Sequence, residues 1–272
     1  MSFRFDGKVA IVTGGAMGIG AATAQVLCEL GASVSILDRD ADAAMRTVSS
    51  LTQRGHTTSF QYCDVACEED VATTVDAVAQ KFGRIDVLVS NAGIQRYGDV
   101  VDTSAAVWNE TLDVNVKGSF YTSKYAIPVM LRSGGGAIVT VASVQSLAAL
   151  GNSAAYVTSK HALLGLTRSI ALDFARQNIR ANCVCLGSID TPMLRWAAAL
   201  TSFPEHATAV FSQMHALGRI GTPEEASRAI AFLASDWASF ITGTSLVVDG
   251  GLLVPAGGMG CENLDLDFAA IR

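Results

Sequence analysis

Short apolar runs alternate with longer amphipathic segments along most of the chain. The apolar runs predict strands over residues 9–12, 32–37, 59–63, 85–89, 136–142, 179–186 and 245–251. The segments between them have helical periodicity and predict helices over 21–30, 40–54, 68–82, 104–131 and 156–176, with a further helix that begins at 222. This alternation is typical of a parallel sheet that helices cover on both faces. Residues 1–272 are therefore expected to form a single α/β domain.

Two segments depart from this alternation. Residues 188–217 interrupt it, and from residue 194 onward they are rich in Ala, Phe and Met. An insertion above the ligand edge of a parallel sheet is expected to be a mobile lid over a substrate. Residues 252–272 form a C-terminal tail, which either frays, as chain ends often do, or covers the site of a neighbouring subunit.

The composition excludes several classes of protein. Half of the 272 residues are hydrophobic and only 16% are charged, so the chain can bury a large core without disulfides or structural metal. The net charge of −6 and the lack of a basic block argue against nucleic acid or an anionic membrane as the main partner. A small-molecule substrate is the expected ligand.

The six cysteines do not form a metal-binding pattern. The sequence has no C-x-x-C pair, and no histidine cluster accompanies Cys63 and Cys67. We therefore expect free thiols in a reducing compartment and no metal site. The sequence also lacks an apolar run of about eighteen residues that would span a membrane, and Arg4, Asp6 and Lys8 interrupt any signal peptide. These features predict a cytoplasmic protein.

A glycine-rich turn at residues 13–20 separates the first predicted strand from the first predicted helix. Its sequence, T-G-x-x-x-G-x-G, brings backbone close to a ligand and directs unpaired helix N–H groups toward it. We interpret this turn as the pyrophosphate site of a dinucleotide, with Gly14, Met17, Gly18 and Ile19 at the ligand. The alternative is a turn whose glycines only allow the helix to pack tightly on the sheet.

Asp38 ends the second predicted strand and indicates which dinucleotide binds. A carboxylate about 20 residues after the glycine-rich turn can accept hydrogen bonds from the ribose hydroxyls of adenosine. These bonds contribute about 1.5–3 kcal/mol, whereas a 2′-phosphate about 4 Å away would be repelled by about 4 kcal/mol. NAD is therefore favoured over NADP. Two alternatives stay open: Arg39 could turn inward to meet a phosphate, and Asp38 could be an ordinary solvated acid.

Polar and small residues also follow the next two predicted strands, on the ligand side of the sheet. Asp64, which precedes Val65, could accept a hydrogen bond from the adenine amino group. Asn91 is followed by two small residues, Ala92 and Gly93. They would let the backbone approach a cofactor closely, or would form an ordinary tight turn.

Four polar side chains are candidates for catalysis. Asn115 is polar where the helical pattern predicts a buried face, so it is either a hydrogen-bonded structural amide or a residue that bends the helix and holds a functional water. Ser143 comes at the carboxyl end of the fifth predicted strand, on the ligand side. Tyr156 and Lys160 share one helix face. A cation about 4 Å away would lower a phenol pKa by about three and make it a usable general base.

The chain resembles the short-chain dehydrogenase/reductase family over about residues 6–251. The motifs of the family are present in order, as Thr13-Gly14-xxx-Gly18-Ile19-Gly20, Asp64-Val65, Asn91-Ala92-Gly93, Asn115, Ser143 and Tyr156-xxx-Lys160. The resemblance implies a Rossmann-like doubly wound parallel sheet of about seven strands, an NAD(P) cofactor and hydride exchange with a carbonyl or a secondary alcohol. It also implies a homotetramer with interfaces at residues 104–132 and 154–177 and at the last strand.

The same resemblance implies a role for each matched residue. Tyr156 would be the general acid/base, and Ser143 would hold the substrate oxygen. Lys160 would lower the tyrosine pKa and bind the nicotinamide ribose, while Asn115 would position a water that links this lysine to solvent. The implied nucleotide contacts are Ile189 and Thr191 with the nicotinamide carboxamide, Asp64 and Val65 with adenine, and Asn91 on the adenosine side.

One departure from the family and the choice of substrate are left open. Leu186-Gly187 replaces the usual Pro-Gly after the sixth strand, so the backbone can take a different path into the nicotinamide pocket here. The residues expected near a substrate, beside Ser143 and Tyr156, are Gln95, Arg96, Gln145, Leu147, Asn152 and Met193. This mixture is compatible with a sugar, a polyol or a cyclic alcohol.

We predict an NAD-dependent dehydrogenase that interconverts a secondary alcohol and a ketone, with Tyr156 as the general acid/base. One alternative is an NADPH-dependent carbonyl reductase of the 3-oxoacyl type. Another is a dinucleotide-binding sensor without catalysis, which would have no need of a phenol poised beside an ammonium.

Overall fold

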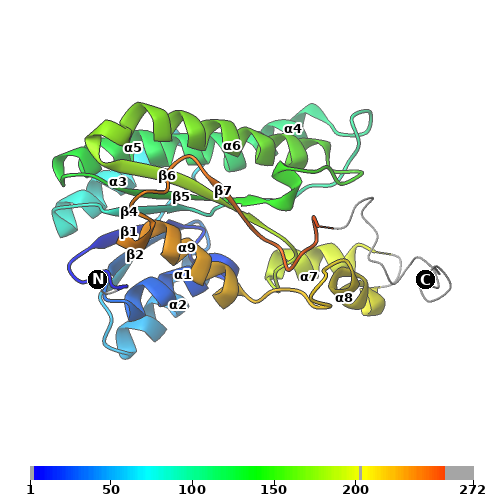
Figure 1. Ribbon diagram of the computed structural model, residues 1–272, viewed down its shortest axis with the longest axis horizontal. Helices are drawn as coiled ribbons and strands as arrows, with labels where there is room; N and C mark the ends of the chain where they lie inside the picture. Colours follow the sequence, from blue (N-terminus) through cyan, green and yellow to red (C-terminus); the bar gives the residue numbers. More distant parts are fainter. Residues whose placement is uncertain (1–2, 202–203, 255–272) are drawn as a thin grey trace, which may run out of the picture.

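The computed structural model describes residues 3–201 and 204–254, which form a parallel sheet between two layers of helices (Figure 1). Within these residues the sheet has seven strands in the order β3-β2-β1-β4-β5-β6-β7. The strands are β1 (Val9–Thr13), β2 (Ser33–Asp38), β3 (Thr58–Tyr62), β4 (Val87–Ser90), β5 (Gly136–Ser143), β6 (Ile179–Leu186) and β7 (Ser245–Val248). The strand order reverses between β1 and β4, and sheets of this type bind ligands at the carboxyl ends on either side of such a reversal.

Helices cover both faces of the sheet. One layer contains α1 (Gly18–Glu29), α2 (Ala41–Gln53) and α9 (Pro223–Ala234), and the other contains α3 (Glu68–Phe82), α4 (Ala105–Leu112), α5 (Gly118–Arg132) and α6 (Ala154–Phe174) (Figure 1). Successive residues of a strand point to opposite layers, so Ala10 and Val12 join one apolar core and Ile11 joins the other. The predicted single-domain, Rossmann-like doubly wound fold is confirmed.

The long helix predicted over residues 104–131 is divided in the structure. A π-helical turn at Asp113–Lys117 joins α4 to α5. Such wide turns are rare and frequently occur at functional sites, because they change the direction in which a side chain points. Asn115 lies in the middle of this turn.

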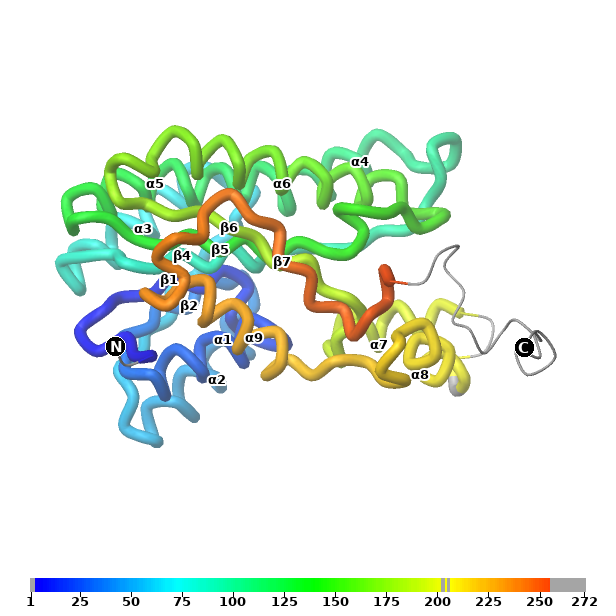
Figure 2. The backbone as a smooth tube through the Cα atoms, viewed as in Figure 1, coloured from blue at the N-terminus to red at the C-terminus, as the bar shows by residue number. Residues whose placement is uncertain are grey.

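The segment predicted to be a mobile lid contains two helices, α7 (Pro192–Ala199) and α8 (Pro204–Gln213). Thr191 caps α7 by accepting a hydrogen bond from the Leu194 N–H at 3.2 Å. Both helices lie beyond the carboxyl ends of the strands, and the residues that follow β7 end beside them (Figure 2). Movement of this segment remains a prediction. Of the predicted C-terminal tail, residues 255–272 lie outside the described residues.

No helix in the part of the chain that the structure describes has both the length and the hydropathy of a membrane span. In the same residues, no group of three or more His, Cys, Asp or Glu side chains is placed to hold a metal ion. The cysteines described are free thiols, namely Cys28, Cys63, Cys67, Cys183 and Cys185. Cys261 falls outside the described residues.

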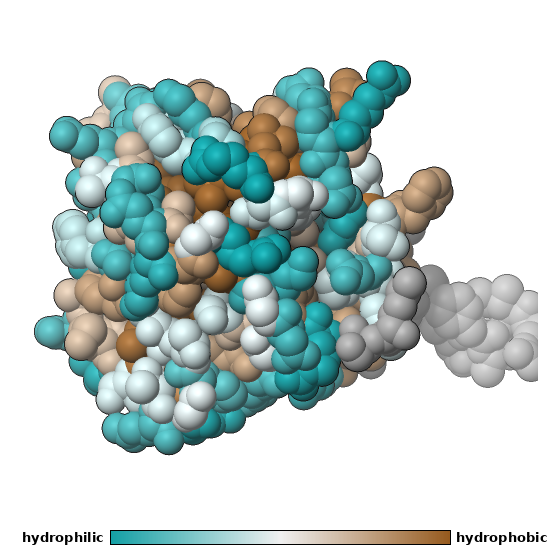
Figure 3. Space-filling view, turned by 90° about the vertical axis from the view of Figure 1, so that its left-hand side faces the viewer, coloured by the Kyte–Doolittle hydropathy of each residue, from teal (hydrophilic) through white to brown (hydrophobic). Residues whose placement is uncertain are grey.

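Asp86 anchors the amino-terminal ends of two central strands. Its buried carboxylate accepts a hydrogen bond from the Val9 N–H at 2.9 Å and pairs with Arg84 at 2.6 Å and Lys8 at 3.4 Å. Hydrophilic residues cover much of this end of the molecule, with apolar residues scattered between them (Figure 3). Asp86 therefore stabilises the sheet at the edge opposite to its ligand side.

We predict that Asp86→Ala lowers the free energy of unfolding by about 2–4 kcal/mol, because it leaves the Val9 N–H and the Arg84 guanidinium without their buried partner. Chemical denaturation measures this change. The matched control is Asp76→Ala on the exposed face of α3, which should change stability by no more than about 0.5 kcal/mol. Equal effects of the two substitutions would contradict the anchoring role.

Candidate active site

A cavity of about 700 Å³ opens at the carboxyl ends of the strands, between the glycine-rich turn and the helices α7 and α8. Most of the residues predicted to bind a cofactor or a substrate line it, namely Gly14, Met17, Gly18, Ile19, Asp38, Asp64, Val65, Asn91, Ala92, Gly93, Gln95, Ser143, Gln145, Tyr156, Lys160, Ile189, Thr191 and Met193. The fold thus gathers side chains from the ends of six strands in one place.

The glycine-rich turn closes one part of the cavity. Gly14 has a φ of +62°, and a Cβ at this position would lie 2.9 Å from the Ala92 Cα, so a larger residue would force the two segments apart. Gly18, with a φ of +57°, begins α1 directly after Met17. The first N–H groups of a helix have no partner inside it and can bind an anion. This geometry fits a pyrophosphate.

Asp38 is held next to this turn by backbone groups. Its carboxylate accepts hydrogen bonds from the Ala16 N–H at 2.9 Å and from the Asp40 N–H at 3.0 Å. Arg39 lines the cavity beside it. The carboxylate therefore orients the turn, and Asp38 also lines the cavity.

Asp64 and Val65 line the cavity directly after β3. The Asp64 Oδ1 accepts a hydrogen bond from the Ala66 N–H at 3.0 Å, which orients the carboxylate. Val65 packs against Gly118, where a Cβ would lie 2.8 Å from the Val65 Cγ2. The start of α5 is thereby brought close to this part of the cavity wall.

Asn91 ties the end of β4 to the glycine-rich turn. Its Nδ2 donates to the carbonyl oxygens of Thr13 at 2.9 Å and Gly14 at 3.0 Å. The N–H groups of Asn91 and Ala92 both donate to the Thr13 Oγ1 at 3.0 Å. The segment after β4 is therefore more than an ordinary tight turn, because it holds the glycine-rich turn in position.

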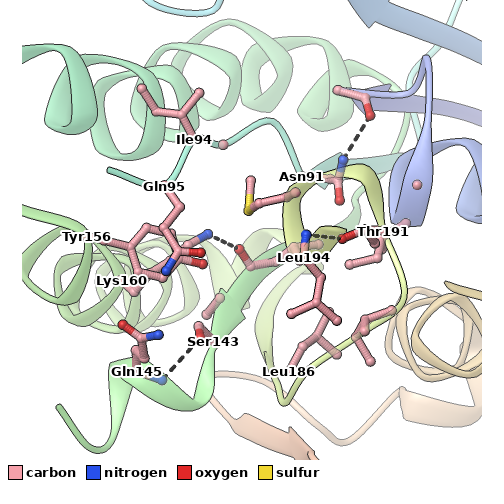
Figure 4. Close-up of a pocket in the computed structure, with 18 of the residues that line it drawn as sticks. Asn91, Ile94, Gln95, Ser143, Gln145, Tyr156, Lys160, Leu186, Thr191 and Leu194 are labelled. Atoms are coloured by element: carbon pink, nitrogen blue, oxygen red, sulfur yellow. Dashed lines mark hydrogen bonds between the residues drawn. The ribbon is translucent and has the colours of Figure 1, made fainter. Parts of the chain in front are cut away.

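Ser143, Tyr156 and Lys160 meet in the wall of the cavity (Figure 4). Ser143 is the last residue of β5, and the other two lie one turn apart on α6. All three are buried, and the Ser143 Oγ accepts a hydrogen bond from the Gln145 N–H at 3.1 Å. The Lys160 Nζ donates to the Val141 carbonyl at 2.9 Å and lies 5.5 Å from the centroid of the Tyr156 ring.

Burial dominates the ionisation of this phenol and this ammonium. It raises the pKa of Tyr156 to about 12, although a hydrogen bond with Ser143 lowers it in part. Burial also lowers the pKa of Lys160 from 10.5 to about 8, because the ammonium loses its hydration. The prediction that Lys160 lowers the pKa of Tyr156 is therefore wrong for the protein without a bound nucleotide. The ammonium faces the Val141 carbonyl and does not offset the desolvation of the phenol.

Asn115 is a fully engaged structural amide. Its Oδ1 accepts a hydrogen bond from the Ile94 N–H at 2.8 Å, and its Nδ2 donates to the Ile94 carbonyl and to the Ser159 Oγ, both at 2.9 Å. The Ser159 Oγ in turn donates to the Tyr156 carbonyl at 2.7 Å. The π-helical turn is thus joined to the first turn of α6, which supports the first of the two interpretations left open for this amide.

Backbone hydrogen bonds hold the loop after β6 in place although Leu186 replaces the usual proline. The Gly187 N–H donates to the Val248 carbonyl at 3.1 Å, and the Asp190 N–H donates to the Gly221 carbonyl at 2.9 Å. Contacts with β7 and with the residues before α9 therefore hold this loop at the cavity.

Two glutamines point toward the phenol from the loops after β4 and β5. Gln95 lies close to Tyr156, and Gln145 lies close to Ser143 (Figure 4). The Gln145 Oε1 is shielded from solvent and has no hydrogen-bond donor among the residues that the structure describes. A buried acceptor without a donor costs about 1–3 kcal/mol, so the packing of this amide beside Ser143 lowers the stability of the fold.

Three of the residues expected near a substrate do not line the cavity. Asn152 lies in an exposed turn with a φ of +54°, which asparagine tolerates, and its carbonyl accepts a hydrogen bond from the Gly98 N–H at 2.8 Å. The Arg96 guanidinium pairs with Glu110 at 2.9 Å. Leu147 is exposed.

Several aromatic or apolar residues of the cavity were not predicted, among them Tyr97, Phe211 and Met214. Tyr97 follows β4 and stacks on Trp196 of α7, with ring centroids 5.9 Å apart. Phe211 lies in the last turn of α8 and Met214 directly follows this helix, three residues later, a spacing that in a helix would place both on one face. That spacing is the signal in the sequence, but it is short and the segment lacks the longer periodicity that identifies a helix.

Comparisons with known proteins agree with this geometry. Residues 14–253 match a family model described as enoyl-(acyl carrier protein) reductase. The chain is 38% identical to cyclohexanol dehydrogenase from Acinetobacter sp. (strain SE19), over 92% of this chain and 96% of the relative. It is 39% identical to cis-4-hydroxycyclohexanecarboxylate dehydrogenase from Sinomonas cyclohexanicum, over 92% and 98%. The solved structure of aldohexose dehydrogenase from Thermoplasma acidophilum is 42% identical, with a TM-score of 0.84 over 94% of this chain and 96% of that one.

The lowered pKa of Lys160 predicts a pH-dependent cost to stability. Because the ammonium is disfavoured in the folded protein, the unfolded chain binds more protons between pH 8 and 10.5, and the contribution of Lys160 to stability rises with pH across that window. Lys160→Met removes this effect. We compare the free energy of unfolding of Lys160→Met with that of the wild type at each pH. The variant minus wild-type difference should be up to about 3 kcal/mol larger at pH 7 than at pH 10.5, since a pKa difference of one corresponds to about 1.4 kcal/mol.

Denaturant unfolding of both proteins across pH 7–10.5 measures this difference. A stability difference that stays constant over this range would contradict the burial of a charged lysine.

Proposed function

The chain belongs to the short-chain dehydrogenase/reductase family, and we propose that it is an NAD-dependent dehydrogenase of a neutral cyclic secondary alcohol. It is an oxidoreductase of the family that acts on alcohols and ketones with a nicotinamide nucleotide. The observation that carries the proposal is the buried meeting of Ser143, Tyr156 and Lys160 in the wall of a cavity that also contains the glycine-rich turn.

The nucleotide site is proposed to extend from the glycine-rich turn to the loop after β6. Gly14, Met17, Gly18 and Ile19 would hold the pyrophosphate, and Asp38 would accept hydrogen bonds from the adenosine ribose. The remaining contacts proposed are Asp64 and Val65 with adenine, Asn91, Ala92 and Gly93 along the adenosine side, Lys160 with the nicotinamide ribose, and Ile189 and Thr191 with the carboxamide. The close approach of Gly14 to Ala92 supports this fit. The two segments can lie this close only because Gly14 has no side chain, so both present backbone to the nucleotide site.

In the proposed reaction, Tyr156 removes the hydroxyl proton of the alcohol. The carbon that bears this hydroxyl group loses its hydrogen as a hydride, with the bonding electron pair, and the product is a ketone. The bound oxidised nicotinamide supplies the hydride acceptor and a positive charge. Ser143 orients the substrate oxygen by donating a hydrogen bond to it from its hydroxyl group. Lys160 keeps positive charge next to the phenol, and Asn115, through Ser159, holds the first turn of α6 that carries Tyr156. In the reverse direction Tyr156 returns the proton to the ketone oxygen.

The proposed substrate is neutral because of the residues that line the far side of the cavity. That side is formed by the loops after β4 and β5 and by α7 and α8, and its lining residues include Gln95, Tyr97, Gln145, Ala148, Leu150, Met193, Leu194, Phe211 and Met214. These residues are apolar apart from the amides of Gln95 and Gln145 and the hydroxyl group of Tyr97. An apolar ring would fill this space, whereas a phosphate or a carboxylate would lack a charge partner.

A second candidate is an NADPH-dependent reductase of 3-oxoacyl substrates. Arg39 favours it, because this residue lines the cavity beside Asp38 and could meet a 2′-phosphate. We place it second because Asp38 is held by two backbone N–H groups and would stay near that phosphate. A sensor without catalysis is third, since binding alone does not require the buried phenol and ammonium.

We also propose a homotetramer in the cytoplasm, with α7 and α8 as a lid that closes over the substrate. Exposed apolar side chains at the expected interfaces support assembly, namely Phe120 on α5, Leu172 on α6 and Val247 on β7. The free thiols described above support a reducing compartment. Met193 and Leu194 on α7 and Phe211 on α8 line the cavity, which supports the lid.

We predict that Tyr156→Phe lowers kcat for the oxidation of a cyclic alcohol such as cyclohexanol by roughly 10³-fold or more, because it removes the acid/base group and keeps the ring. The formation of NADH measures the rate. Binding of NADH, followed by fluorescence, should change by less than about twofold, since the phenol oxygen contributes little to nucleotide affinity. A variant that keeps most of the activity would contradict the role of Tyr156.

We further predict that kcat/KM is at least about tenfold higher with NAD than with NADP, because Asp38 repels a 2′-phosphate. Asp38→Asn should reduce this preference, while Asp102→Asn in an exposed loop should leave it unchanged. Initial rates with the two nucleotides at equal concentration provide the comparison. A preference of the wild-type enzyme for NADP would favour the second candidate function.

A further inference from the structure

His215 is a buried histidine two residues after the end of α8, with only 4% of its surface exposed. Its ring lies between three segments. A Cβ at Gly187 would come within 2.9 Å of the His215 Nε2, and a Cβ at Gly250 would lie 3.5 Å from the His215 Cδ2. The imidazole therefore fills the space between the end of β6, the end of α8 and the residues after β7. Figure 2 shows these segments converging beyond the sheet.

The hydrogen bonds of His215 define its tautomer. The Ser188 N–H donates to the Nε2 at 3.1 Å, so the Nε2 carries no proton. The Nδ1 lies 2.7 Å from the Phe211 carbonyl, which can only accept, so the Nδ1 carries the proton. His215 is thus a neutral imidazole that uses both nitrogens, one toward α8 and one toward the loop after β6.

This pair of bonds closes the α7–α8 segment into a loop. The segment leaves the loop after β6 at Thr191 and returns at His215, which contacts Ser188 just before the departure point. The Ser188 carbonyl accepts a hydrogen bond from the Gly221 N–H at 2.9 Å, so both backbone groups of Ser188 are occupied. Ser188 precedes Ile189, one of the two residues proposed to meet the nicotinamide carboxamide.

We propose that His215 is a positioning residue that couples the lid to the nicotinamide site. Its imidazole fastens the end of α8 to Ser188, so the position of α8 and the position of the carboxamide-binding loop are set together. This inference rests on the proposed function, because it takes residues 189–191 as nicotinamide contacts. Phe211 and Met214, which line the substrate side of the cavity, are four residues and one residue from this fastening point.

The test compares His215→Leu with His215→Gln. Leucine removes the acceptor and leaves the Ser188 N–H buried without a partner, whereas the glutamine Oε1 can take the place of the Nε2 as an acceptor. Amide hydrogen exchange of residues 188–191 and 206–214, without nucleotide, should accelerate at least roughly tenfold in His215→Leu and return toward wild type in His215→Gln. The Kd for NADH should follow the same pattern, rising roughly five- to tenfold in His215→Leu.

The matched control is His161→Leu on the exposed face of α6, because the His161 Nδ1 also contacts a carbonyl four residues earlier, that of Val157, at 2.9 Å. This variant should behave as wild type in both measurements. Faster exchange in His215→Leu with an unchanged Kd for NADH would overturn the coupling, and so would equal losses in His215→Leu and His215→Gln. A wild-type protein that binds neither NADH nor NADPH would contradict the proposed function, while the exchange result would still decide the fastening of α8.

Discussion

The burial of a phenol and an ammonium on one turn of α6 is the constraint on which the whole site depends. Removal from water raises the pKa of Tyr156 and lowers that of Lys160, so each group is pushed toward its neutral form. With its pKa raised in this way, the phenol would need further positive charge beside it in order to ionise near neutral pH. In the proposed function that charge comes with the oxidised nucleotide, which would make removal of the alcohol proton depend on an occupied nucleotide site.

The parallel sheet supplies the geometry that this chemistry needs. Ser143 pairs with Leu186 at the carboxyl ends of β5 and β6, and the loop after each strand opens onto the same cavity. Backbone hydrogen bonds hold the polar side chains of the adjoining loops, as they do for Asp38 and Asn91. The site therefore depends on the register of the strands, which anchors such as Asp86 secure from the opposite edge of the sheet.

Much of this architecture could be predicted from the sequence, because local patterns encode it. Apolar runs located the strands, and the spacing of Tyr156 and Lys160 placed both on one helix face. The substrate side was less predictable: Asn152 lies outside the cavity, and Phe211 enters it through a helix too short to show periodicity. His215 gave no signal, since its contacts with Ser188 and Gly250 depend on segments far apart in the chain. The pKa of Tyr156 also could not be predicted from a spacing, because desolvation depends on the complete packing around the phenol.

The most direct test of this account is an ultraviolet difference titration of Tyr156 in the complex with NAD, with Tyr156→Phe as the reference that removes the signals of the other tyrosines. The account predicts that this phenol ionises with a pKa below about 10, the value of a free tyrosine, once the oxidised nucleotide is bound, and well above that value without nucleotide. A pKa that stays near 12 in the complex would contradict the central claim, because Tyr156 could not then act as the base near neutral pH.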